Sequence, residues 1–233
     1  MSLEIQRIRA ICFDIDGTLS DTDDLWVQRL GKTLAPVKFF LPNRQTEPFA
    51  RWVVMGAESP GNMMYSLLDR MNLDADVGRL YEAISKFRPS SRQPRVYKIV
   101  PDVREALQLI NGRYPMSIVS ARDQNGTHAF LNQYELFPMF HSIATSQTCH
   151  HTKPYPDPVL WAAQQMGVLP EACLMVGDSS VDIRAGRAAG AQTVGVLCGF
   201  GTEKELRRAG ADLIIPSTAY LPEVLFGKQV LPG

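Results

Sequence analysis

Two aspartates, Asp14 and Asp16, follow a short apolar run and precede a Gly17-Thr18 turn. The apolar run is typical of a buried strand, so the two carboxylates come at its C-terminal end. In open α/β sheets, ligands bind at that end of the strands. Two carboxylates with neighbouring backbone N–H groups can hold a hard cation and a phosphate together. A solvated Asp-Gly turn is the simpler alternative for this segment taken alone.

A second pair of acids, Asp178 and Asp182, follows another strand-like run and begins a helical pattern. Right-handed crossovers bring the C-terminal ends of parallel strands together, which places Asp178 near Asp14. Mg²⁺ prefers oxygen ligands, which Asp14, Asp178, the backbone carbonyl of Asp16 and a phosphate oxygen would supply. A role as helix N-cap explains Asp178 alone, but not two strands that both end in acids.

Three further side chains come at or near predicted strand ends. The hydroxyl of Ser120 and the N–H of Ala121 can donate to a phosphate oxygen. The ammonium of Lys153 can neutralise a carboxylate and a transferring phosphoryl group. Arg122 is a candidate contact for the leaving group of a substrate, or for a surface acid. Each signal is weak alone, because such serines usually form turns and surface lysines are usually solvated.

Helix-like and strand-like segments alternate from Pro101 onward, as in a parallel sheet covered by helices. Strands are expected at 11–13, 116–119, 142–144, 172–176, 193–197 and 213–215, and helices at 103–109, 125–134, 157–166 and 179–189. We expect Asp157 to be the N-cap of its helix, with Pro158 in the first turn. Residues 202–205 have the pattern of a capping box.

The segment 20–94 has apolar residues at helical spacing and little strand character, unlike the rest of the chain. It predicts a small all-helical cap domain, inserted after the first strand of a core that comprises 1–19 and 95–233. The expected fold class is therefore α/β, with a Rossmann-like parallel sheet core flanked by helices and a helical cap.

Composition narrows the choice of partner. Lys plus Arg and Asp plus Glu both total 24 in 233 residues, so no net charge favours nucleic acid or an anionic membrane, and we expect a small-molecule ligand. Four cysteines without CxxC spacing indicate free thiols in a reducing compartment. Neither a signal-peptide pattern nor an apolar run of membrane-spanning length is present. These features predict a cytoplasmic protein, as a monomer or homodimer.

Four motifs in this order resemble those of the haloacid dehalogenase-like superfamily. They are Asp14-Ile15-Asp16-Gly17-Thr18, then Ser120, then Lys153, then Gly177-Asp178-Ser179 with Asp182. The segments 153–158, 185–190, 199–203 and 209–212 are similar to the phosphoglycolate phosphatase branch, whose helical cap is inserted after the first motif.

This resemblance implies a Mg²⁺-dependent phosphatase that acts on a small phosphate ester, such as phosphoglycolate or a sugar phosphate. Asp14 would attack phosphorus to give an aspartyl-phosphate, and Asp16 would protonate the leaving oxygen and then activate water. The metal ligands would be Asp14, Asp178 and the Asp16 carbonyl. The phosphoryl oxygens would be bound by Gly17, Ser120, Ala121 and Lys153. Asp182 would orient Lys153 or a metal-bound water, with Thr18 and Ser179 supporting these groups.

Two alternatives stay open beside the phosphatase. A β-phosphoglucomutase-like phosphotransferase keeps all four motifs and differs in its cap and in the access of water to the intermediate. A catalytically idle binding module is disfavoured because no catalytic position is missing. Asp16 argues against a haloacid dehalogenase or a phosphonate hydrolase, which lack a second aspartate.

Overall fold

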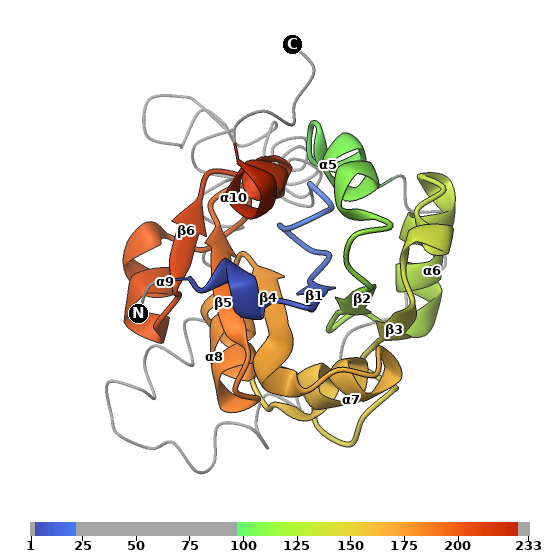
Figure 1. Ribbon diagram of the computed structural model, residues 1–233. Helices are drawn as coiled ribbons and strands as arrows, with labels where there is room; N and C mark the ends of the chain where they lie inside the picture. The colour runs from blue at the N-terminus through green and yellow to red at the C-terminus, as the bar shows by residue number, and fades with distance from the viewer. Residues whose placement is uncertain (1–2, 22–96, 228–233) are drawn as a thin grey trace, which may run out of the picture. The chain divides into compact units, whose positions relative to one another are not determined.

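The computed structural model describes residues 3–21 and 97–227, and these residues form a parallel α/β sheet with helices on both faces (Figure 1). The strands are β1 (Ala10–Phe13), β2 (Met116–Val119), β3 (Ser142–Ala144), β4 (Cys173–Gly177), β5 (Gln192–Val196) and β6 (Leu213–Ile215). They pair in parallel in the order β3-β2-β1-β4-β5-β6. The expected fold class of the core is confirmed.

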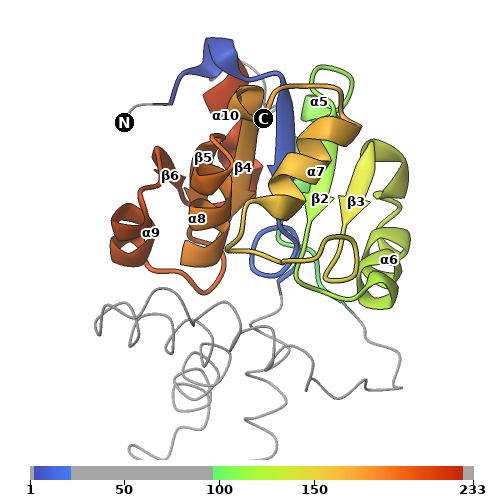
Figure 2. The same cartoon turned by 90° about the horizontal axis from the view of Figure 1, so that it is seen from below.

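Six α-helices connect or follow these strands in the described part of the chain. They are α5 (Val103–Ile110), α6 (Gln124–Gln133), α7 (Asp157–Gln165), α8 (Ser180–Ala188), α9 (Glu203–Ala209) and α10 (Leu221–Phe226). Short 3-10 helices occur at Ile5–Arg7, Phe137–Met139, Pro170–Ala172 and Thr218–Tyr220. Helices α7 and α8 pack on one face of the sheet and α5 and α10 on the other, and Figure 2 looks at the face that α7 and α8 cover.

Strand β1 lies in the middle of the sheet, between β2 and β4. Its side chains alternate between two cores: Ile11 and Phe13 join the cluster beneath α5 and α10, and Ala10 and Cys12 join the cluster beneath α7 and α8. All four residues are fully buried, which explains why this strand is continuously apolar rather than alternating. The chain that leaves β1 therefore emerges at the centre of one sheet edge.

The observed helix and strand boundaries lie within a few residues of the expected ones, and one predicted helix cap is wrong. Helix α7 begins at Asp157 itself, and its N-cap residue is Pro156, without a side-chain cap. The carboxylate of Asp157 instead contacts Nδ1 of His151 at 3.1 Å. The expected capping box at 202–205 is confirmed, because Thr202 and Glu205 bond each other's backbone N–H groups.

The predicted helical cap, 20–94, lies outside the described residues apart from Ser20 and Asp21, and it stays a prediction. Every described residue belongs to one compact unit, Met1–Asp21 with Tyr97–Gly233. Within 3–21 and 97–227, no helix is long and apolar enough to cross a membrane.

Candidate active site

Three adjacent strands end at the same edge of the sheet, and each is followed by a polar residue predicted from the sequence. Asp14 follows β1, Ser120 follows β2 and Asp178 follows β4. Backbone hydrogen bonds to the neighbouring strands hold Asp14 and Ser120 in place. The N–H of Asp14 donates to the carbonyl of Val176 at 3.0 Å, and the N–H of Ser120 donates to the carbonyl of Ala144 at 2.9 Å. The parallel topology thus brings together residues more than a hundred positions apart.

Lys153 extends between two carboxylates at this edge. Its Nζ lies 2.6 Å from Oδ1 of Asp14 and 2.6 Å from Oδ1 of Asp182, and its side chain is only 3% exposed. Burial lowers the pKa of the Lys153 ammonium, but the charges of Asp14 and Asp182 outweigh burial and hold that pKa above its ordinary value. Lys153 therefore carries a fixed positive charge.

The surroundings of Asp14 shift the pKa of its carboxyl group strongly. Burial raises its pKa most, Lys153 opposes the rise, and the charges of Asp182 and Asp16 add to it, giving a pKa of about 7. Oδ1 of Asp14 accepts a hydrogen bond from Lys153, while Oδ2 has no hydrogen-bond partner in the described part of the chain. One carboxylate oxygen is thus fixed and the other is available for chemistry.

Asp182 is held by the first turn of α8. Its Oδ2 accepts from the backbone N–H of Ser179 at 3.0 Å and from the Ser179 hydroxyl at 2.5 Å, and its other oxygen faces Lys153. One oxygen of Asp182 is therefore held by Ser179 while the other pairs with Lys153.

Asp178 is fixed by groups from two distant loops. Its Oδ2 accepts from the N–H of Phe200 at 2.8 Å, and its Oδ1 lies 3.5 Å from the hydroxyl of Thr18. The carbonyl of Thr18 in turn accepts from the hydroxyl of Thr218 at 2.8 Å. Thr18 is fully buried, and these two contacts link Asp178 through Thr18 to Thr218.

Three glycines surround Asp178 so closely that no larger residue fits. A Cβ atom at Gly17 or Gly199 would collide with the Asp178 carboxylate, and one at Gly201 would collide with its backbone carbonyl. Gly17 also has a φ of +76°, in the left-handed region that favours glycine. Sequence analysis did not assign a role to Gly199 and Gly201, although their spacing before a helix was the available signal.

The acidic residues fit a divalent cation. Asp14, Asp178 and Asp182 are all buried, and each offers a carboxylate oxygen within 4.8 Å of the others. Lys153 pairs with two of these three carboxylates. Hard oxygen donors in a buried anionic cluster are the set that Mg²⁺ prefers, and a cation would relieve the repulsion that raises the Asp14 pKa.

Arg122 contacts a carboxylate of the site rather than a surface acid. Its Nε donates to Oδ2 of Asp16 at 2.7 Å and its Nη2 donates to Oδ1, while its guanidinium lies 4.7 Å from the Tyr97 ring centroid and 5.6 Å from that of Phe130. Arg122 is 8% exposed and Asp16 35%. Burial lowers the pKa of Arg122, but Asp16 outweighs burial and the pKa rises. Sequence analysis missed both aromatic partners.

Ser120 and Ala121 form the turn after β2. The Ser120 hydroxyl oxygen accepts from the N–H of Arg122 at 3.1 Å, which leaves its own proton to donate. Within the described ranges, the N–H of Ala121 has no acceptor. Two donors on this turn are thus available to an anion.

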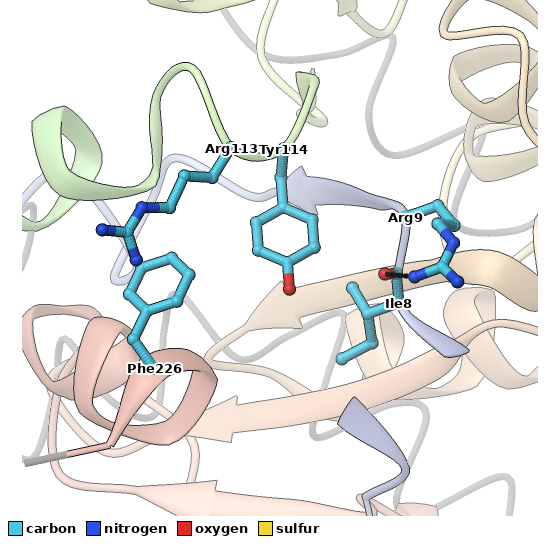
Figure 3. Close-up of a pocket in the computed structure, with 5 residues that line it drawn as sticks. All are labelled: Ile8, Arg9, Arg113, Tyr114 and Phe226. Carbon is cyan, nitrogen blue, oxygen red and sulfur yellow. Dashed lines mark hydrogen bonds between the residues drawn. The ribbon is translucent and has the colours of Figure 1, made fainter. Parts of the chain in front are cut away.

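A cavity of about 330 Å³ lies at the opposite edge of the sheet, before β1 and β2 begin (Figure 3). Its lining residues are Ile8, Arg9, Arg113, Tyr114 and Phe226. Figure 3 shows the Tyr114 ring standing between Phe226 and Ile8, and the Arg113 guanidinium lies 4.2 Å over the Phe226 ring. This lining has no carboxylate and contains none of the site residues predicted from the sequence.

Known proteins are similar to this chain over most of its length. A phosphoglycolate phosphatase from Nitrosococcus oceani is 28% identical over 234 residues, covering 95% of this chain and 98% of the relative. The pyrophosphatase PpaX from Oceanobacillus iheyensis is 29% identical over 208 residues, covering 89% of this chain and 92% of the relative. The crystal structure of a family hydrolase from Deinococcus radiodurans, with bound phosphate and sodium, has a TM-score of 0.66 at 24% identity, covering 94% of this chain and 95% of that one.

A family model also matches most of the chain. The model of the haloacid dehalogenase-like hydrolases matches residues 11–196. This range starts at β1 and runs through β5, so it includes the strand ends that carry Asp14, Ser120 and Asp178 and the loop that carries Lys153. Because the match spans most of the chain, the protein belongs to the haloacid dehalogenase-like hydrolase family.

Proposed function

We propose that this protein is a Mg²⁺-dependent phosphatase of the cytoplasm that hydrolyses a small phosphate monoester through an aspartyl-phosphate at Asp14. The observation that carries the proposal is the placement of Lys153 between Asp14 and Asp182, beside Asp178. This arrangement fixes one oxygen of Asp14 and leaves the other to attack. The phosphatase names of the relatives support the reaction class.

The first step forms an aspartyl-phosphate, a mixed anhydride between the Asp14 carboxylate and the phosphoryl group. The Oδ2 of Asp14 attacks the phosphorus atom, the bond from phosphorus to the ester oxygen breaks, and the leaving oxygen takes a proton from Asp16. Lys153 stays bonded to Oδ1 and offsets the negative charge that gathers around phosphorus. The Ser120 hydroxyl and the Ala121 N–H donate to the phosphoryl oxygens.

The second step returns the enzyme to its starting state. Asp16 accepts a proton from water as the water attacks phosphorus, the bond between phosphorus and Asp14 breaks, and inorganic phosphate leaves. Asp14, Asp178 and the Asp16 carbonyl would hold Mg²⁺, with Phe200 and the surrounding glycines keeping Asp178 in place. The bound cation would supply electrostatic stabilisation of the phosphoryl group.

The test is phosphate release from a panel of small phosphate monoesters, with Mg²⁺ and with a chelator, for the wild type and for Asp14→Asn. We expect metal-dependent release by the wild type and none by the variant. Absence of release from every ester, or full activity of Asp14→Asn, would contradict the proposal. An isomerised hexose phosphate formed without free phosphate would indicate the mutase instead.

A further inference from the structure

Arg122 binds the carboxylate to which the proposed mechanism assigns proton transfer. Both oxygens of Asp16 accept from the one guanidinium, through Nε at 2.7 Å and through Nη2. A bidentate pair of this kind fixes both the plane and the rotation of the carboxylate. To give a proton to a leaving oxygen, an oxygen of Asp16 must turn toward the reacting group. At least one of the two contacts with Arg122 must then break.

Arg122 has no route into bulk solvent when that contact breaks. It is 8% exposed, and its guanidinium is packed against the rings of Tyr97 and Phe130. Its Nη1 is already buried without a hydrogen-bond partner in the described part of the chain. A buried guanidinium that loses its carboxylate is strongly unfavourable unless another anion takes the vacated position. A change at Asp16 therefore requires a replacement anion beside Arg122.

We propose that Arg122 exchanges Asp16 for an acidic group of the substrate, so that the enzyme acts on phosphate monoesters whose leaving group carries a second carboxylate or phosphate. This inference rests on the proposed phosphatase function. The replacement anion belongs to the leaving group because Asp16 must lie beside the leaving oxygen and Arg122 is hydrogen-bonded to Asp16. The charge of a correct substrate thus releases Asp16, whereas a neutral leaving group leaves the pair closed.

Matched substrate pairs test the exchange, using the full chain with Mg²⁺. One pair is 2-phosphoglycolate and 2-hydroxyethyl phosphate, and the other is 3-phosphoglycerate and glycerol 3-phosphate. The quantity measured is the ratio of kcat/KM for the charged member to kcat/KM for the neutral member. We expect the wild type to favour the charged member by ~10-fold or more, because a hydrogen-bonded ion pair with the substrate replaces the one with Asp16.

The informative variant is Arg122→Gln, in which the ratio should fall ~10-fold or more, to near one. Because both members of a pair are measured on the same variant, a general loss of activity or stability divides out of the ratio. Arg122→Lys keeps the charge but loses the planar fork, so it should give an intermediate ratio, and it serves if Arg122→Gln does not fold.

Arg104→Gln is the matched control. Arg104 is a half-exposed arginine of α5 that pairs with Glu135 at 2.9 Å, and its removal should leave the ratio unchanged. A wild type without preference for the charged members, or an Arg122→Gln protein that keeps the wild-type ratio, overturns the exchange and leaves the phosphatase proposal intact. Absence of phosphate release from every ester overturns the phosphatase proposal and the exchange with it.

Discussion

The ammonium of Lys153 lies 2.6 Å from Oδ1 of Asp14, and both side chains are buried. This contact joins the loop after β3 to the chain that follows β1, so the ion pair that holds the proposed nucleophile also links two distant segments of the fold. Lys153 also contacts Asp182, which means that its removal would leave two buried carboxylates without their cation. Removing one partner of a buried ion pair is far more costly than removing an exposed pair.

Lys153→Met should therefore lose both activity and stability. We expect phosphate release to fall at least ~100-fold, because the charge beside the reacting phosphoryl group is lost. We also expect the free energy of unfolding to fall by about 3–5 kcal/mol in urea titrations. Lys204→Met, at an exposed position of α9, should change neither quantity. An inactive Lys153→Met protein with wild-type stability would show that the ion pair has no structural role.

Asp14→Asn should stabilise the metal-free protein while abolishing phosphate release. The ionised form of Asp14 is disfavoured, since burial and neighbouring acids raise its pKa from 3.8 to about 7. Asparagine has nearly the same shape and carries no charge, so at pH 8 in chelator it should add about 2–4 kcal/mol to the free energy of unfolding. Urea titration of both proteins measures this difference. Equal free energies of unfolding for the two proteins would mean that ionised Asp14 does not destabilise the folded state.

The raised pKa of Asp14 should also make the free energy of unfolding depend on pH. Between about pH 4 and pH 7 the folded metal-free protein holds a proton on Asp14 that the unfolded chain has lost. The folded state therefore binds more protons in this window, and the contribution of Asp14 to stability falls as the pH rises through it and is constant above it. Subtracting the urea-derived profile of Asp14→Asn from that of the wild type isolates this contribution. A flat difference would contradict the raised pKa.

Mg²⁺ binding should release a proton below pH 7 and none above pH 8. The cation favours the ionised form of Asp14, so a carboxyl group with a pKa of about 7 must lose its proton when the metal binds. Calorimetric titration at pH 6 in buffers of different ionisation enthalpy counts the released protons. Heats that are independent of the buffer at pH 6 would exclude Asp14 as the titrating group.

The strand ends that carry the site could be predicted from the sequence because their determinants are local. The central strand β1 is apolar at every position and is followed directly by Asp14, and a parallel sheet built from crossovers places the ends of β1, β2 and β4 together. This prediction required the order of the elements along the chain and no interatomic distance. The same reasoning located Ser120 and Asp178 at the edge, because each directly follows a buried strand.

The contacts between side chains from different loops could not be predicted from the sequence. Arg122 was a candidate for a leaving group or a surface acid, and its actual partner Asp16 is 106 positions away. The direction of a side chain after a strand depends on packing, here against Tyr97 and Phe130, which no local pattern encodes. The error at Asp157 has a similar cause, since contact with His151 takes its carboxylate away from the helix N-terminus.

A substitution at Gly201 tests whether the loop after β5 holds the proposed metal site in place. A Cβ atom at this position would collide with the backbone carbonyl of Asp178, so alanine must displace either the loop or Asp178. The N–H of neighbouring Phe200 donates to the Asp178 carboxylate, and this bond would shift with the loop. Loss of such a supporting contact lowers metal affinity by ~10- to 100-fold. We expect Gly201→Ala to show this loss in calorimetric titration with Mg²⁺.

The matched control is Gly112→Ala, because Gly112 has a φ of +83° but a Cβ atom there would meet no other group within 4 Å. Alanine at this position should lower the free energy of unfolding by about 1–2 kcal/mol through backbone strain alone and leave Mg²⁺ affinity unchanged. A loss of stability without a loss of Mg²⁺ affinity in Gly201→Ala would show that the loop is merely structural. Loss of affinity in Gly201→Ala, but not in Gly112→Ala, would place the loop after β5 among the elements that hold Asp178 in its binding position.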